Sequence, residues 1–534
     1  MKPIDFSKLI VYQIYPRSFQ DSNGDGIGDL QGIISRLDHL QDLGINAVWL
    51  CPCYPSPQKD NGYDISDYRS IHAEYGSFAD WAQLRDGLHA RGMHLIMDLV
   101  ANHTSDCHPW FQEAKSARNN PYHDYYIWVK KPPNTWKSCF GGSAWKYNAE
   151  TDEYYLHSFA ESQPDLNWEN PRVRAEIRNV VDFWTAQGVD GFRCDVIDFI
   201  SKDFSSPQLY GGPYLRAYLK ELFHRPNVSH LFTIGESQAT RKDVALLCGK
   251  DSQALTTVFQ FEHARLGQSK KDKFSPAKVS LDDVRNVLVK WQNVSAGLEF
   301  PYAIFMDNHD QAPFLSRLGN DGKYRYECAA MLAAMFYLLK GIPFIFQGQE
   351  YGTTSPSYAE IQAFSDVESL QYYHQQKDTL GEKAVLSALN FGSRDNARRP
   401  MAWTKNPNDA HGFSTGKPWL AIHSRAGEIN LEKDKTASKS VFRFYQKLLA
   451  YRKQSDCILH GSFRDCTGEK NGCFIYERRF QNKRVLVFCN FKRAQSLPVP
   501  LTEDYTLVLC NYPQTAPPSP LFQPYEARVY EKKS

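Results

Sequence analysis

The 534-residue sequence contains no apolar run long enough to cross a bilayer, and its N-terminus has none of the features of a secretory signal. Residues 1–6 lack the basic stretch and the following apolar segment that such a signal needs. We therefore expect a protein that has no membrane partner and stays in the cytoplasm.

The sequence also has little net charge and no spacing of cysteines or histidines that is typical of a metal site. Its 62 Lys and Arg against 60 Asp and Glu give a formal net charge of +2, which does not favour a nucleic-acid partner. Twelve Cys are scattered between Cys51 and Cys510 without a disulfide framework or a zinc motif. We expect reduced thiols, no zinc site and no organic cofactor.

Short apolar runs alternate with stretches of helical periodicity between residues 9 and 346. Residues 30–43, 78–91 and 171–187 have the spacing of amphipathic helices. Repeated strand–helix units predict parallel strands with right-handed crossovers, and therefore a doubly wound sheet or a closed barrel. Eight strands favour an α/β fold of the (β/α)8 TIM-barrel type. We place the strand centres at Val11, Val48, Ile96, Phe192, Ile234, Phe259, Ile304 and Phe344.

The alternation breaks twice, and each break predicts a further domain. Residues 104–167 are rich in Trp, Tyr, Asn, Pro and Gly, which predicts a loop-rich domain inserted after the third strand. Residues 457–534 contain strand-like segments without helices between them, which predicts a small antiparallel β domain. The barrel itself is then formed by residues 1–103 and 168–456.

Residues 188–197 predict a buried strand that delivers Asp195 to the edge of the sheet. Arg193 lies two residues before Asp195 and therefore on the same face of the strand. A neighbouring guanidinium keeps a carboxylate ionised, which suits a nucleophile. Alone, an Arg-x-Asp pair is more often a structural ion pair, so the assignment depends on the other residues that join it.

Other strand ends carry similar groups. Glu236 follows a buried run, His103 ends the segment that also carries Asp98, and His309 and Asp310 follow another strand. Barrel enzymes draw catalytic groups from the ends of several strands, so these side chains can converge on one pocket. Crowded carboxylates have pKa values that are pushed apart, so that one is ionised and another holds a proton. Cleavage of a glycosidic bond with retention requires this pair of states.

Residues 21–29 resemble the first half of an EF-hand loop, because oxygen-bearing side chains recur at every second position and Gly26 is the sixth residue. The Glu of the twelfth position is missing, since Gly32 stands there. We favour a bound Ca²⁺, with Mg²⁺ as an alternative, over an Asx-rich turn without metal. The expected ligands are Asp21, Asn23, Asp25, Asp29 and the carbonyl of Ile27.

Four short motifs together resemble those of the α-amylase family of glycoside hydrolases, in the family's order and at about its spacing. They are residues 98–103 (DLVANH), 191–195 (GFRCD), 235–236 (GE) and 308–311 (NHDQ). The resemblance implies that Asp195 is the nucleophile, Glu236 the general acid/base, and Asp310 the carboxylate that holds the ring hydroxyls. It also implies that His103 and His309 bind hydroxyls and that Arg193 orients Asp195.

Three further segments are similar to those of the oligo-1,6-glucosidase branch of this family: residues 60–64, 163–167 and 393–398. By that likeness Asp60 and Arg398 close the pocket behind a terminal glucose, Tyr63 stacks on the sugar, and Gln163 belongs to the substrate-binding set. Val196 directly follows Asp195, and at this position it is similar to relatives that cleave α-1,6 bonds.

The resemblance implies a retaining, exo-acting α-glucosidase that hydrolyses α-1,6 bonds at the non-reducing end of short isomalto-oligosaccharides. We expect it to be a monomer. Three alternatives stay open. A Lys-rich run at residues 269–273 would suit a trehalose-6-phosphate hydrolase. A sucrose-active hydrolase or isomerase is another, and here hydrolysis is favoured over isomerisation, because residues 265–269 lack two charged members of the loop that sucrose isomerases of this branch carry. A non-catalytic sugar-binding relative is disfavoured by the retained carboxylates.

Overall fold

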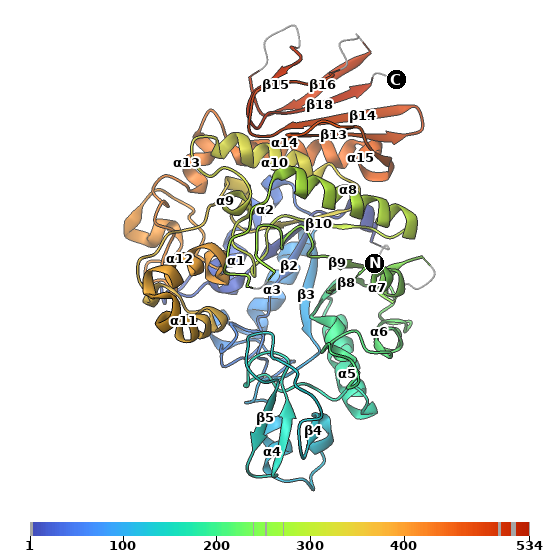
Figure 1. The fold of residues 1–534 in the computed structure, drawn as a ribbon, viewed down its shortest axis with the longest axis vertical. Coiled ribbons are helices and arrows are strands. Elements are labelled where there is room, and N and C mark those ends of the chain that lie inside the picture. The colour runs from blue at the N-terminus through green and yellow to red at the C-terminus, as the bar shows by residue number, and fades with distance from the viewer. Residues whose placement is uncertain are drawn as a thin grey trace.

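Eight parallel strands form one nearly closed sheet at the centre of the molecule (Figure 1). They follow one another around the ring in chain order, and β11 pairs with both β10 and β1. The predicted (β/α)8 barrel is therefore confirmed, and all eight predicted strand centres lie inside the observed strands. These strands are β1 (Val11–Ile14), β2 (Ala47–Leu50), β3 (His94–Val100), β7 (Gly191–Asp195), β8 (Phe232–Glu236), β9 (Thr257–Phe259), β10 (Ala303–Phe305) and β11 (Ile342–Phe346).

This computed structural model describes residues 4–238, 240–250, 254–270, 272–499, 504–513 and 519–532. Residues 1–3 of the N-terminal segment and Lys271 of the Lys-rich run lie outside the described part. Within that part, none of the helices combines the length and the apolar character that a membrane crossing requires.

The strands are short and apolar because both faces of a parallel sheet are covered. Side chains that point into the barrel form a core of their own, to which seven of the eight strands contribute aromatic rings or branched aliphatic groups. The ring of Phe259 lies 5.6 Å from that of Trp49 and 4.7 Å from that of Phe344, so the interior is filled and is not a pore.

Helices cover the outside of the barrel, and several begin at a polar residue that caps the free N–H groups. Ser77 forms a capping box with Asp80 at the start of α3, and Asn170 caps α5 with a proline in its first turn. The predicted helix 30–43 is two helices that meet at Arg36. The helices are α1 (Leu30–Ser35), α2 (Leu37–Leu43), α3 (Phe78–Ala90), α5 (Pro171–Ala186), α6 (Leu215–Phe223), α7 (Arg241–Cys248), α8 (Leu281–Leu298), α9 (Phe314–Arg317), α10 (Arg325–Tyr337), α11 (Val367–Leu380), α12 (Glu382–Gly392), α13 (Leu431–Thr436), α14 (Val441–Gln454) and α15 (Asp456–His460).

The segment between β3 and α5 projects from one end of the barrel, at the bottom of Figure 1. It contains a three-stranded antiparallel sheet of β4 (Trp128–Val129), β6 (Glu153–Leu156) and β5 (Trp145–Asn148), in that order. It also contains the helix α4 (Pro109–Ser116), which its composition did not predict. Its two ends are joined by a bridge between His103 and Asp165, so the chain leaves and re-enters the barrel at one place.

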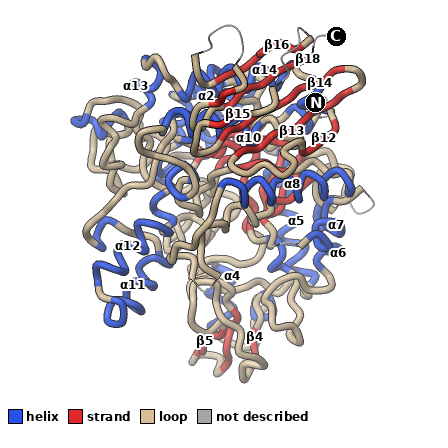
Figure 2. The backbone as a smooth tube through the Cα atoms, turned by 45° about the horizontal axis from the view of Figure 1, so that its top comes forward, coloured by secondary structure: helices blue, strands red, loops and turns tan. Residues whose placement is uncertain are grey.

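The C-terminal segment forms a separate antiparallel sheet, shown at the top of Figures 1 and 2. Tyr476 of β13 donates a hydrogen bond to the carbonyl of Ala334 in α10 (3.1 Å), and Arg478 donates one to that of Leu338 (3.0 Å). This sheet is therefore fastened to the barrel through buried polar contacts. Its strands are β12 (Ser462–Asp465), β13 (Cys473–Phe480), β14 (Lys483–Asn490), β18 (Ala527–Lys532) and β16 (Tyr505–Cys510); β15 (Gln495–Ser496) pairs with β17 (Leu521–Phe522).

Replacing Trp184 by Ala should destabilise the barrel by about 3–5 kcal/mol, because the residue is fully buried and the change leaves a cavity. Its ring packs 4.9 Å from that of Trp81, and its indole N–H donates to the carbonyl of Tyr68 at 2.8 Å. Urea unfolding measures the loss. Leu246→Ala on the surface of α7 is the control and should change stability by less than about 0.5 kcal/mol. Equal effects of the two substitutions would contradict this account of the core.

Candidate active site

A cavity of about 90 Å³ lies at the carboxyl ends of the barrel strands. The segment inserted after β3 contributes to its wall through Phe140 and Phe159. Seven of the ten catalytic and substrate-binding candidates line it, while Gln163, Arg193 and Arg398 lie behind the wall. The lining residues are Asp60, Tyr63, His103, Phe140, Phe159, Asp195, Val196, Glu236, His309, Asp310 and Arg394.

The guanidinium of Arg193 binds three carboxylates at once. Its Nη1 atom donates to Asp195 Oδ1 and to Asp98 Oδ1, each at 2.7 Å, and its Nη2 atom donates to Glu236 Oε2 at 2.5 Å. The guanidinium is buried and lies 4.9 Å over the ring of Trp49, whose N–H also binds Asp98. One cation therefore joins the ends of β3, β7 and β8.

The sharing of Arg193 changes the expected distribution of charge. Burial raises the pKa of Asp195 well above its usual value; Arg193 opposes this effect and Glu236 adds to it. Burial likewise raises the pKa of Asp98 to about 6. We had expected Arg193 to keep Asp195 ionised on its own, but one cation cannot neutralise three carboxylates. The cluster thus favours a state in which one carboxyl group keeps a proton.

Asp310 has the opposite environment. Burial alone would raise its pKa, but the neighbouring His309, Arg398 and Arg394 hold that pKa below its usual range. Arg398 donates to Asp310 Oδ1 at 2.7 Å, and His309 Nε2 lies 3.2 Å from Oδ2. Asp310 is therefore an anion throughout the neutral range.

His309 is held as a neutral ring. Burial lowers its pKa to about 3. Gln13 Nε2 lies 2.8 Å from Nδ1, which places the ring proton on Nε2, toward Asp310. The ring of Tyr63 stacks on it at 5.2 Å with an angle of 5° between the planes. His309 can therefore donate one hydrogen bond in a fixed direction.

The sequence predicts that Asp60 and Arg398 close the pocket together, but the arginine that pairs with Asp60 is Arg394. Arg394 Nη2 donates to Asp60 Oδ1 at 2.8 Å and also binds Asp366, while Arg398 is fully buried behind Asp310. Gln163 donates to the other Asp60 oxygen at 3.0 Å. The two arginines are four residues apart in one short segment, so sequence alone could not tell which one faces the cavity. Asp366 was not predicted.

His103 lies beside this pair, 3.1 Å from Gln163 Nε2, and burial lowers its pKa. It is therefore neutral near pH 7. Together with Asp60 and Arg394 it forms a polar end to the cavity.

Val196 has a backbone conformation that β-branched residues rarely adopt, with φ +34° and ψ +45°. Strain of this kind persists where the surrounding structure holds it, often at functional sites. Here the turn directs the N–H of Val196 to Glu236 Oε2 at 3.2 Å. The residue after Asp195 therefore also positions Glu236.

Asp198 is a site residue that the sequence did not reveal. It lies in the short 3-10 helix η5 (Ile197–Ile200) and accepts hydrogen bonds from Ser237 Oγ (2.8 Å) and from the N–H of Gln238 (2.6 Å). These are the two residues that follow Glu236. Burial raises the pKa of Asp198 to about 7. Its position three residues after Asp195 was the only available signal.

The predicted metal loop is closed by its own hydrogen bonds. Asp21 accepts from the N–H groups of Asn23, Gly24 and Gly26, and Asp29 caps α1 through Gly32. Among the described residues no three Asp, Glu, His or Cys side chains are grouped so as to hold a metal ion. An ion here would thus also need the amide oxygen of Asn23 and the carbonyl of Ile27, which belong to the predicted donor set. A carboxylate oxygen that accepts a hydrogen bond can still bind a cation, so Ca²⁺ at this loop stays a prediction.

Comparisons with family models, with curated proteins and with solved structures all identify the same family. The model of the family described as "Alpha amylase, catalytic domain" matches residues 13–461. The chain is 41% identical to the oligo-1,6-glucosidase of Parageobacillus thermoglucosidasius over 99% of both chains. The crystal structure of the trehalose-6-phosphate hydrolase of Bacillus licheniformis has a TM-score of 0.93 and 37% identity, and covers 99% of this chain and 100% of that one. An isomaltulose synthase of Erwinia rhapontici, solved with sucrose, has a TM-score of 0.93 and 34% identity, with 100% of both chains covered.

Proposed function

Because the chain belongs to the α-amylase family of glycoside hydrolases, we propose that it is an exo-acting α-glucosidase of small oligosaccharides. It hydrolyses α-1,6-glucosidic bonds at the non-reducing end and retains the configuration of the released glucose. The observation that carries the proposal is the contact of one guanidinium with both Asp195 (2.7 Å) and Glu236 (2.5 Å). Retention needs two carboxyl groups only about 5–5.5 Å apart, and this shared partner keeps them close.

The reaction proceeds in two displacements. Glu236 donates its proton to the bridging oxygen while Asp195 attacks the anomeric carbon, which gives a covalent β-glucosyl intermediate. Glu236 then removes a proton from water, which attacks the same carbon and releases α-glucose. The first displacement needs one proton among the carboxyl groups around Arg193, and three carboxyl groups that share one cation favour such a state.

The polar end of the cavity explains the exo action. Asp60 and Arg394 bind each other at 2.8 Å and close the cavity behind the sugar that occupies it. The ionised Asp310 accepts hydrogen bonds from ring hydroxyls, and the neutral His309 donates one. A closed end admits only the terminal residue of a chain.

The α-1,6 preference rests on Val196 and on the relatives named oligo-1,6-glucosidase. A trehalose-6-phosphate hydrolase is the second candidate, because proteins with that name are similar over the whole chain. That activity requires a cation for the phosphate group. Lys273, one cation of the Lys-rich run, forms an ion pair with Glu368, so its charge is already compensated.

Turnover should be fastest on isomaltose and panose and much slower on sucrose and on trehalose 6-phosphate. Asp195→Ala should lower kcat by roughly 10⁴-fold or more, because it removes the nucleophile while Asp98 and Glu236 still pair with Arg193. Released glucose measures the rate, and circular dichroism checks the fold. Asp86→Ala, an exposed carboxylate on α3, is the matched control and should leave kcat unchanged. Retained activity of Asp195→Ala would contradict the proposed mechanism. Turnover of trehalose 6-phosphate and of none of the other sugars would contradict the proposed substrate and favour the trehalose-6-phosphate hydrolase.

The enzyme is further proposed to act in the cytoplasm as a monomer. The twelve cysteines all lie in the described part of the chain and all are free thiols, which suits a reducing compartment.

A Ca²⁺ ion is proposed at the Asp21 loop, where it would fix the loop before α1 and take no part in the chemistry. Removing it with a chelator should lower the Tm by about 5 °C, and added Ca²⁺ should restore the Tm. Asp25→Ala, which removes an exposed ligand, should make the Tm insensitive to both treatments. A wild-type Tm that responds to neither chelator nor Ca²⁺ would contradict the site.

Asp198→Asn should shift the alkaline limb of the kcat/KM profile to lower pH by roughly half a unit. Burial raises the pKa of Asp198 to about 7, so the residue gains its negative charge as the pH rises through neutrality. That charge accepts hydrogen bonds from the two residues that follow Glu236, and a negative charge so close favours retention of a proton by a nearby carboxyl group. Asn cannot gain the charge.

The stability of the Asp198→Asn variant should also depend on pH differently from that of the wild type. In the wild type, the stability conferred by neutral Asp198 is full below the ordinary carboxyl pKa of 3.8 and is lost as the pH rises from there through about 7. The Asn variant should not lose it, which denaturant unfolding between about pH 4 and 8 measures. An alkaline limb identical to that of the wild type would contradict the role of Asp198.

A further inference from the structure

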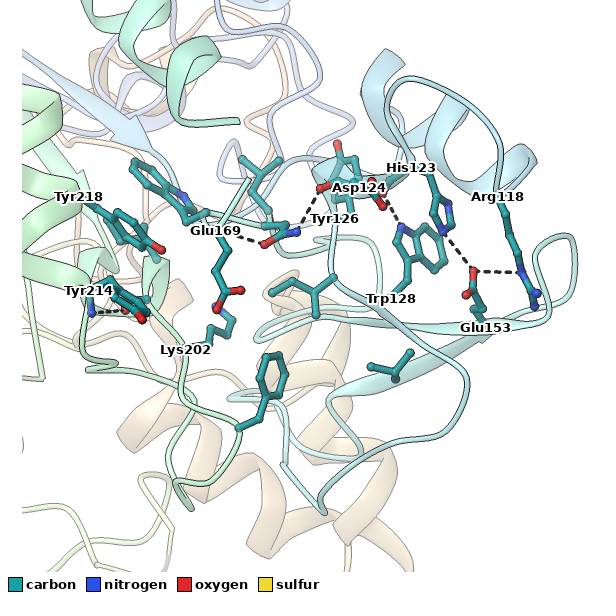
Figure 3. Close-up of a pocket in the computed structure, with 18 residues that line it drawn as sticks. Arg118, His123, Asp124, Tyr126, Trp128, Glu153, Glu169, Lys202, Tyr214 and Tyr218 are labelled. Carbon is teal, nitrogen blue, oxygen red and sulfur yellow. Dashed lines mark hydrogen bonds and ion pairs between the residues drawn. The ribbon is translucent and has the colours of Figure 1, made fainter. Parts of the chain in front are cut away.

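A second cavity, of about 480 Å³, lies between the inserted segment and the barrel (Figure 3). Tyr214 and Tyr218, at the start and on the first turns of α6, form one wall, and Trp128 of β4 forms the other. Glu169 and Lys202 lie between the two walls. None of these residues lines the active-site cavity, so the two cavities are separate.

Aromatic rings with open faces line this cavity and are held in place by other rings. Tyr214 is 54% exposed, and its ring lies 5.9 Å from that of Tyr218, which in turn lies 5.7 Å from that of Trp168. Phe204 is 40% exposed and stacks on Trp136 at 5.3 Å. Rings fixed in this way lose little freedom when a ligand stacks on them.

The polar groups of the cavity are suited to accept hydrogen bonds. Lys202 is engaged, since its Nζ atom binds Asp165 (2.8 Å) and Asn102 (3.0 Å), and Glu153 is engaged with Arg118 and His123. The carboxylates of Asp124 and Glu169, by contrast, belong to exposed residues and accept no hydrogen bond from the residues that the structure describes. Figure 3 shows the Glu169 side chain pointing into the gap.

The aromatic rings and the carboxylates of the cavity together indicate which class of ligand it can bind. Carboxylates without a cationic partner repel phosphates and other anions, and an apolar ligand would leave them without a partner. A sugar ring satisfies both features, because its C–H face packs on an aromatic ring while its hydroxyl groups donate to carboxylates.

We propose that this cavity is a second, non-catalytic site for a short α-glucoside chain. The assignment to α-glucosides rests on the proposed function, which supplies that substrate. The two cavities share a wall, because Lys202 contacts Asn102, whose side chain lies 3.2 Å from Nδ1 of His103 in the active site. A chain bound here raises the local concentration of substrate beside the active site.

Isothermal titration of the Asp195→Ala enzyme with isomaltotriose tests the proposal, because this variant binds without turnover. Two binding sites are expected. Adding Tyr214→Ala should weaken one of them by about tenfold or more and leave the other unchanged. Tyr147→Ala is the matched control, since Tyr147 is an equally exposed aromatic residue (47%) on β5 outside the cavity. Glu169→Gln, which keeps the shape of the cavity, should weaken the same site.

The outcomes separate this inference from the function on which it rests. A single site that is unaffected by Tyr214→Ala, or two sites that both survive it, would overturn the inference while leaving the function intact. No binding at any site would count against the proposed substrate as well. In the active enzyme, Tyr214→Ala should leave the kcat for a small aryl α-glucoside unchanged, since Tyr214 does not line the catalytic cavity.

Discussion

The site depends on one buried cation, the guanidinium of Arg193. It binds carboxylates at the ends of three neighbouring strands, Asp98 on β3, Asp195 on β7 and Glu236 on β8. Removing one partner of a buried ion pair typically costs about 3–5 kcal/mol, because the other charge stays without compensation. Arg193 therefore holds the barrel mouth together and sets the spacing of the reacting groups at the same time.

The electrostatic asymmetry of the site follows from how cations are distributed over the carboxylates. Three carboxyl groups share Arg193, whereas Asp310 is next to Arg398, Arg394 and a neutral histidine. The three carboxyl groups around Arg193 can hold a proton near neutral pH, whereas Asp310 cannot. Acid–base chemistry and the binding of hydroxyl groups are thus separated by a few ångströms within one cavity.

The barrel and the catalytic carboxylates could be predicted, because buried parallel strands leave continuous apolar runs and their carboxyl ends must converge. Other features depend on tertiary contacts that no local pattern encodes. The choice of Arg394 over Arg398 as the partner of Asp60 depends on which way a 3-10 turn faces. The contacts of Asp198 and Asp366 join segments that are distant in the sequence. The break at Arg36 and the short helix α4 (Pro109–Ser116) lie in stretches too short for their periodicity to predict a helix boundary or a helix.

The configuration of the glucose that is released first tests the central claim most directly. Proton NMR of the hydrolysis of an aryl α-glucoside, whose leaving group is not a sugar, shows the anomer of the released glucose when it is recorded before mutarotation equilibrates the anomers. Two displacements at the anomeric carbon through Asp195 predict that α-glucose appears first and that the β anomer follows only as mutarotation proceeds. Initial release of β-glucose would contradict the account, because it would mean a single displacement by water without a covalent intermediate.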